Sequence, residues 1–79
     1  MNYIVIELQT IDGTTSAITN VYSSYPLAEQ AYHTILAAAA VSDVTIHSAS
    51  MLTERGNLVK YECYDRTPPP EPEPEPEAE

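Results

Sequence analysis

The stretch SSYPLAEQAYHTILAAAAVS, residues 23–42, decides the fold because its apolar residues recur at the spacing of an amphipathic helix. Ser24 is suited to cap this helix and Pro26 to its first turn, while Glu29 complements the positive end of the helix dipole. The alanines let the helix lie close to its neighbour. The predicted buried stripe comprises Ala28, Ala31, Ile35, Ala38 and Ala39, with Leu27, Tyr32 and Leu36 beside it.

A hairpin is predicted before the helix. Residues 2–10, NYIVIELQT, alternate and are rich in β-branched side chains, which is typical of a strand. Asp12 and Gly13 are a strong signal for a hairpin turn, and residues 16–24 supply a weaker return strand.

A second hairpin is predicted after the helix. Residues 44–53 and 58–65 read as strands, and the turn between them carries Gly56 where a positive φ is needed. The chain therefore predicts an α+β fold: a two-layer ββαββ sandwich, with one helix on an antiparallel sheet.

Composition divides the chain into two parts. Residues 1–67 form the predicted domain, and residues 68–79, PPPEPEPEPEAE, hold six of the seven prolines. Alternating proline and glutamate cannot bury apolar surface, so this segment is predicted to be a disordered, solubilising acidic tail. Docking onto a basic partner is the alternative for the tail.

The net charge of the predicted domain limits the classes of partner that it can bind. The formal net charge is −9, but residues 1–67 hold seven acidic against three basic side chains, which leaves them near −4. This balance argues against direct binding of nucleic acid, which needs a basic surface. Only Arg55, Lys60 and Arg66 could attract a phosphate.

The single cysteine, Cys63, cannot form an internal disulfide, and no Cys/His spacing suggests structural zinc. The N-terminal residues lack the basic start of a signal peptide, and the longest apolar run, ILAAAAV, is too short to cross a membrane. We therefore expect a cytoplasmic protein with a reduced Cys63, no metal and no membrane partner.

A domain this small has a marginal core, and self-association is the common remedy. One helix covers only one face of a sheet, so the other face should remain apolar and uncovered. A homo-oligomer that covers this face is predicted. On it we expect Tyr3, Val5, Ile18, Tyr22, Met51, Tyr64 and Ala49.

The two histidines, His33 on the outer side of the helix and His47 on a strand, lack the further ligands that a metal site requires. For catalysis, Ser48, Ser50 and Asp43 are available by residue type only. Surface or interface polar groups are the favoured interpretation, and recognition of a ligand is the alternative.

The sequence has six tyrosines and neither phenylalanine nor tryptophan. Tyr22, Tyr25 and Tyr32 gather around the start of the helix, where free N–H groups could also hold a phosphate. Rings in the core or at an interface are the favoured interpretation, and stacking on a nucleotide base is the alternative.

The segments YIVIELQT, AEQAYHTILAAAAVS and GNLVKYECYD resemble small phage and prophage proteins of gut Firmicutes. These relatives share a YVIELQ opening, a helix of the type AES.YH..LA.AAVS and often a Pro/Glu-rich tail. The resemblance spans essentially the whole chain. It implies a phage-encoded protein that acts in the infected bacterial host.

A phage origin favours a protein that acts by binding, without catalytic residues or a cofactor. The favoured hypothesis is a counter-defence sponge that sequesters a nucleotide-type immune signal, such as a cyclic nucleotide or ADP-ribose derivative, in a pocket between subunits. A phage tail or assembly accessory and a direct inhibitor of a host defence effector are the alternatives. The candidate ligand-binding residues are Tyr22, Tyr25, Tyr32, His33, His47, Arg55, Lys60 and Arg66.

Overall fold

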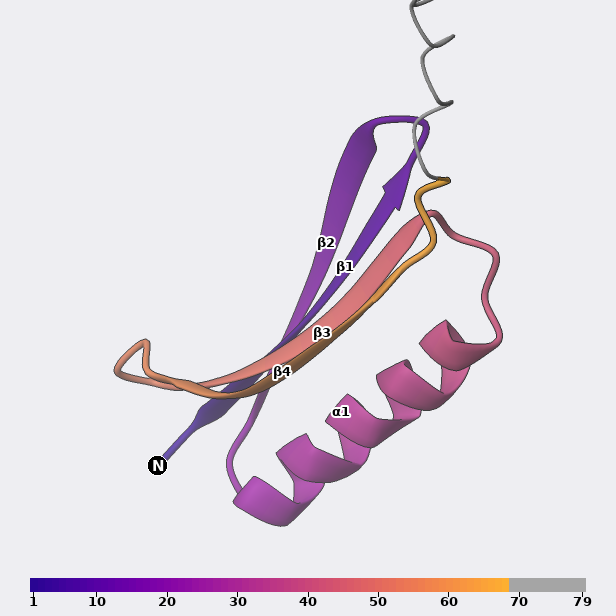
Figure 1. Cartoon of the computed structure of the whole chain (residues 1–79). Helices are drawn as coiled ribbons and strands as arrows, with labels where there is room; N and C mark the ends of the chain where they lie inside the picture. The colour runs from indigo at the N-terminus through magenta and orange to yellow at the C-terminus, as the bar shows by residue number, and fades with distance from the viewer. Residues whose placement is uncertain (69–79) are drawn as a thin grey trace, which may run out of the picture.

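The computed structural model describes residues 1–68 and consists of two hairpins joined by one helix. The predicted α+β class and the element order are confirmed (Figure 1). All elements lie within residues 1–67, and the predicted acidic tail lies outside the described residues except for Pro68. The elements are β1 (Tyr3–Ile11), β2 (Thr14–Tyr22), α1 (Tyr25–Ala40), β3 (Ile46–Thr53) and β4 (Leu58–Asp65).

The four strands form one antiparallel sheet in the order β2-β1-β3-β4. The two hairpins therefore meet through β1 and β3, which are the central strands. At the first turn Asp12 and Gly13 both have positive φ, of 53° and 81°, as a two-residue hairpin turn requires. Gly56 has φ 88° in the second turn, as predicted.

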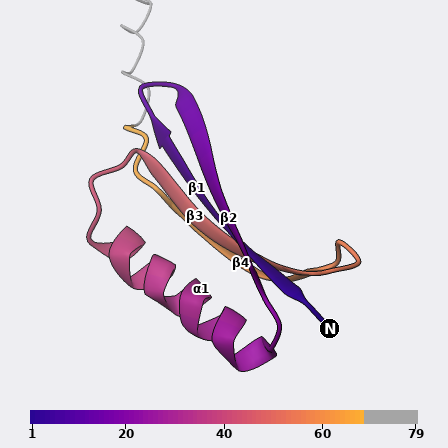
Figure 2. The same ribbon diagram turned by 180° about the vertical axis from the view of Figure 1, so that it is seen from behind.

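Helix α1 begins at its predicted cap. The Ser24 hydroxyl accepts a hydrogen bond from the Leu27 N–H at 3.4 Å, and Pro26 lies in the first turn. Figures 1 and 2 show the helix along one side of the sheet, with no described element on the other side. The small Ala28 and Ala39 are fully buried, so the helix backbone approaches the sheet closely.

The core lies between α1 and the sheet. Its buried members are Val5, Ala28, Tyr32, Ala49 and Met51. Half-buried side chains that pack against them are Tyr3, Tyr22, Tyr25, Ala31, Ile35 and Leu36.

The predicted assignment of the two sheet faces is wrong. Val5, Ala49 and Met51, expected on the uncovered face, are buried against the helix, and Tyr3 and Tyr22 pack on the same cluster. The register places Ile18 and Tyr64 on this helix side too, because they pair with Glu7 and His47. The physical reason is that both alternating sets of the sheet contain large apolar side chains, so the local pattern does not determine which set faces the helix.

The uncovered side of the sheet is therefore the other set of alternating residues, which we call the open face. Val21 and Tyr61 keep 63% and 59% of their surface exposed there. Residues that pair across strands share a face. The open face comprises Ile4, Ile6, Leu8 and Thr10 of β1, Thr15, Ala17, Thr19 and Val21 of β2, Ile46, Ser48, Ser50 and Leu52 of β3, and Leu58, Tyr61, Cys63 and Asp65 of β4.

Candidate ligand-binding site

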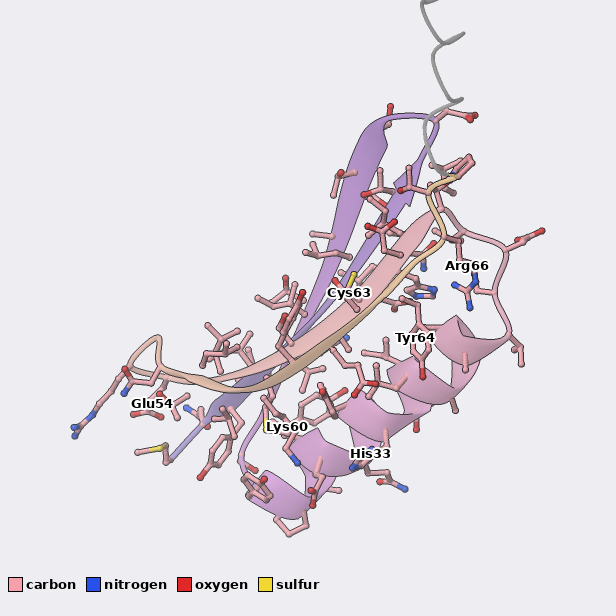
Figure 3. The ribbon with its side chains drawn as sticks, in the orientation of Figure 1. His33, Glu54, Lys60, Cys63, Tyr64 and Arg66 are labelled. Carbon is pink, nitrogen blue, oxygen red and sulfur yellow. The ribbon has the colours of Figure 1, made fainter. Side chains whose placement is uncertain are left out.

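Lys60 of β4 lies beside the N-terminal half of α1 and organises a group of polar and aromatic side chains (Figure 3). Its ammonium donates a hydrogen bond to Glu29 Oε2 at 2.8 Å. The same Nζ lies 5.7 Å from the ring centre of Tyr25 and 5.6 Å from that of Tyr32, within the range of cation–π attraction. We call Tyr25, Glu29, Tyr32, His33 and Lys60 the Lys60 cluster.

Helical spacing brings the other members to Lys60. Tyr25, Glu29 and His33 follow one another at intervals of four residues, so they lie on one side of α1. His33 Nε2 lies 3.8 Å from Glu29 Oε2, and its side chain remains 62% exposed. The cluster thus presents a cation, the half-buried ring of Tyr25 and an accessible imidazole along one edge of the helix, while the Tyr32 ring lies buried behind Lys60.

Charge pairing fixes the protonation of the cluster. The hydrogen bond from Lys60 lowers the pKa of Glu29, and the same bond raises the pKa of Lys60. Burial, followed by the nearby Glu62 carboxylate, raises the pKa of Tyr32. Lys60 therefore stays a cation at neutral pH, which suits it to holding an anion and not to acting as a base.

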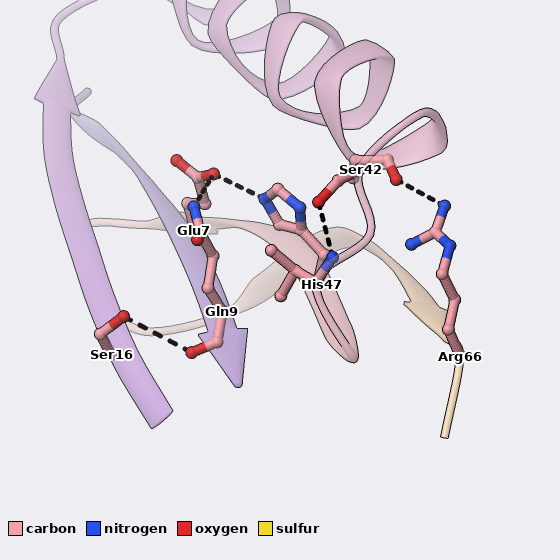
Figure 4. A network of polar contacts seen from close by, with 8 residues as sticks. Glu7, Gln9, Ser16, Ser42, His47 and Arg66 are labelled. Carbon is pink, nitrogen blue, oxygen red and sulfur yellow. Dashed lines mark hydrogen bonds and ion pairs between the residues drawn. The ribbon is translucent and has the colours of Figure 1, made fainter. Parts of the chain in front are cut away.

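His47 lies in a different place, between the sheet and the C-terminal half of the helix (Figure 4). Its Nε2 is 2.6 Å from Glu7 Oε2, and the Gln9 side-chain amide donates to the same oxygen at 2.8 Å. The His47 side chain is only 4% exposed, and its Nδ1 has no hydrogen-bond partner among residues 1–68. These contacts join β3 to β1 beneath the helix, which is a structural role.

Arg66 closes the end of the helix. Its Nη2 donates to the carbonyl oxygens of Ala39 at 2.7 Å and Ala40 at 3.0 Å. Its guanidinium carbon lies 5.4 Å from the centre of the Tyr64 ring. The carbonyls of the last helical turn have no N–H partner within the helix and carry the negative end of the helix dipole. Arg66 therefore caps the C-terminal end of α1.

The remaining candidates lie elsewhere. Arg55 is exposed in the β3–β4 turn, and Tyr22 is half-buried in the core. The structure therefore brings Tyr25, Tyr32, His33 and Lys60 together, and leaves Tyr22, His47, Arg55 and Arg66 outside that cluster.

Two acidic residues were missed as members of the polar clusters. The interval of four between Glu29 and His33 could have revealed the first. Glu7 lies forty positions from His47, and only the pairing of β1 with β3 brings them together. No local sequence signal predicts that contact.

Within residues 1–68 a single chain contains no detectable pocket and no group of three or more side chains that could hold a metal ion. The described helix is neither long nor apolar enough to span a membrane. No protein-family model, no curated protein and no solved structure matches this chain.

Proposed function

We propose that the protein acts by binding and not by chemistry, and that the Lys60 cluster holds an anionic nucleotide-type ligand. The observation that carries the proposal is the position of Lys60 beside the rings of Tyr25 and Tyr32, with His33 accessible next to them. A protonated lysine attracts phosphate, the half-buried ring of Tyr25 offers a face on which a base can stack, and an imidazole can donate a hydrogen bond. Tyr32 is buried in the core and supports Lys60 from below.

In this proposal the protein is a phage-encoded sponge that sequesters an immune signal in the host cytoplasm. The ligand class is a cyclic nucleotide or an ADP-ribose derivative. The acidic balance of the domain supports a small ligand over a nucleic acid, whose repeated phosphates would meet too few cations.

Glu29 is central to how such a ligand would bind. Its carboxylate already pairs with Lys60, so a ligand phosphate would have to replace it as the partner of the ammonium. A single described chain has no pocket, so enclosing the ligand between subunits would require a contact on the helix side of the sheet, at the Lys60 cluster itself.

A thermal-shift screen tests the proposal. Cyclic di- and trinucleotides, cyclic ADP-ribose isomers and linear ADP-ribose conjugates would be compared. A ligand that binds only the folded state stabilises it by about 2.7 kcal/mol at a hundredfold excess over its Kd. We expect one class to raise the melting temperature selectively, and a flat screen would contradict the proposal.

Two variants assign the site once a ligand is found. Lys60→Gln should abolish the shift, whereas Glu29→Gln should preserve or increase it because the competing carboxylate is gone. Arg55→Gln, which removes an exposed cation outside the cluster, is the matched control and should leave the shift unchanged. Recovery of the ligand intact after heating distinguishes a sponge from an enzyme.

The open face favours a second candidate function, a phage tail or assembly accessory, since an uncovered apolar surface suits a subunit of a larger assembly. Mass spectrometry of purified particles separates the two. A sponge should be absent from the particles, and a tail or assembly accessory should be present.

A further inference from the structure

The open face is almost free of charge although the chain is strongly acidic. Asp65, at the end of β4, is its only charged member. The other charged side chains of the described residues lie on the helix side, in turns or in loops: Glu7, Asp12, Glu29, Asp43, Glu54, Arg55, Lys60, Glu62 and Arg66.

We propose that two copies of this chain pack against each other through their open faces. Residues 1–67 hold seven acidic against three basic side chains, so the charged parts of their surface carry a net like charge that disfavours contact with a second copy. The open face is where two copies can meet without bringing like charges together. A neutral, apolar surface on an acidic chain is therefore suited to a copy of itself.

The shape of the open face is also self-complementary, because rows of large and small side chains lie next to each other. Ile4, Ile6 and Leu8 make a row of large side chains on β1, and the neighbouring β3 carries the small Ser48 and Ser50. Ser48 is only 5% exposed although no described element covers it, and it pairs with Leu8 on one side and Cys63 on the other. Around a two-fold axis, the β1 row of each copy can lie over the β3 serines of the other.

The size of the face is sufficient. Four strands spaced about 4.8 Å apart, with about eight residues rising about 3.3 Å each, cover about 500 Å² in plan. Two such faces bury about 1,000 Å², which reaches the lower limit for a specific interface. This additional buried area matters for stability because Val5 and Met51 are the only large side chains fully buried among the described residues.

Self-association through the open face goes beyond the proposed ligand binding and does not require it. The Lys60 cluster lies on the helix side of the sheet, away from this interface. Loss of one property therefore need not remove the other, and the two can be measured separately.

Sedimentation equilibrium of the full chain over a dilution series tests the interface. We expect a mass near twice 8.7 kDa that falls towards 8.7 kDa on dilution. Val21→Glu and Tyr61→Glu place a charge at side chains that are 63% and 59% exposed in the single chain, so both variants should fold and remain monomers. Leu27→Glu, at a helix position that is 52% exposed, is the matched control and should still dimerise.

Labelling of the Cys63 thiol supplies a second readout that needs no variant. Cys63 belongs to the open face, so its labelling rate in the wild-type protein should rise on dilution. A monomeric wild type at every concentration would overturn the proposal. An oligomer that survives both face substitutions, or that Leu27→Glu dissociates, would also overturn the proposal, as would a labelling rate independent of concentration.

Discussion

On the helix side of the sheet Val5 and Met51 are 1% and 0% exposed, whereas on the open face Val21 and Tyr61 remain 63% and 59% exposed. Both faces carry large apolar side chains, and they differ in what covers them. A single helix can cover only one face, so the chain has more apolar surface than its own fold uses. The difference separates residues that stabilise the domain from residues that are available to a partner.

The largest expected effect comes from a matched pair of valines on the two faces. Val5→Ala should lower the free energy of unfolding by about 2–3 kcal/mol, since it removes buried methyl groups and leaves a cavity. Val21→Ala should cost less than about 0.5 kcal/mol in dilute solution. Urea unfolding of both variants checks the contrast, and equal losses at high dilution would contradict the assignment of the faces.

A smaller loss is expected at the buried polar contact on the helix side. Glu7→Ala removes the partner of His47 Nε2 and of the Gln9 amide, which should cost about 1–3 kcal/mol. Glu7→Gln retains an oxygen acceptor and should cost less. Chemical denaturation of both variants measures the two losses in the free energy of unfolding. If Glu7→Ala leaves that free energy unchanged, the contact contributes nothing to stability.

Arg66→Ala should destabilise the domain by about 1 kcal/mol, because the Ala40 carbonyl loses its donor and the Ala39 carbonyl is left with the N–H of Ser42. Amide exchange should become faster in the last turn of α1 and remain unchanged in the first. A uniform change along the helix would argue against capping by Arg66.

The smallest expected effect is a change in the pH dependence of stability at the Lys60 cluster. The pKa of Glu29 is lowered by the hydrogen bond from Lys60. Its contribution is therefore complete above the ordinary carboxyl pKa and is lost as the pH falls through the lowered value in the folded state. Glu29→Gln should flatten the stability profile in this acidic range, as thermal unfolding across pH would measure. An unchanged profile would contradict the pairing.

Local signals predicted most of the fold. The hairpin turn at Asp12 and Gly13, the cap at Ser24 and the positive φ of Gly56 each depend on a few neighbouring residues, and the structure contains all three. The order of the strands and the choice of covered face depend on packing between distant segments. Alternation in β1 showed two apolar sets, and only the alanine-rich surface of α1 decides which one it covers.

The same distinction applies to the candidate site. Tyr25, Tyr32 and His33 lie near one another because helical spacing places them there, and sequence alone could predict this. Lys60 joins them because β4 packs beside α1, a contact between distant segments that no local pattern reveals. Arg66 was predicted as a phosphate ligand, but in the structure its Nη2 donates to a carbonyl oxygen at the end of the helix.

The most direct test of the central claim, that the open face is a surface for a second copy, is an isotope-filtered NMR experiment on a mixture of labelled and unlabelled protein. We expect intermolecular contacts from the methyl groups of Ile4, Ile6 and Leu8 to the side chains of Ser48 and Ser50. Intermolecular contacts that involve Leu27 and Val41 of the helix side, or none at all in a protein that tumbles as a monomer, would contradict it.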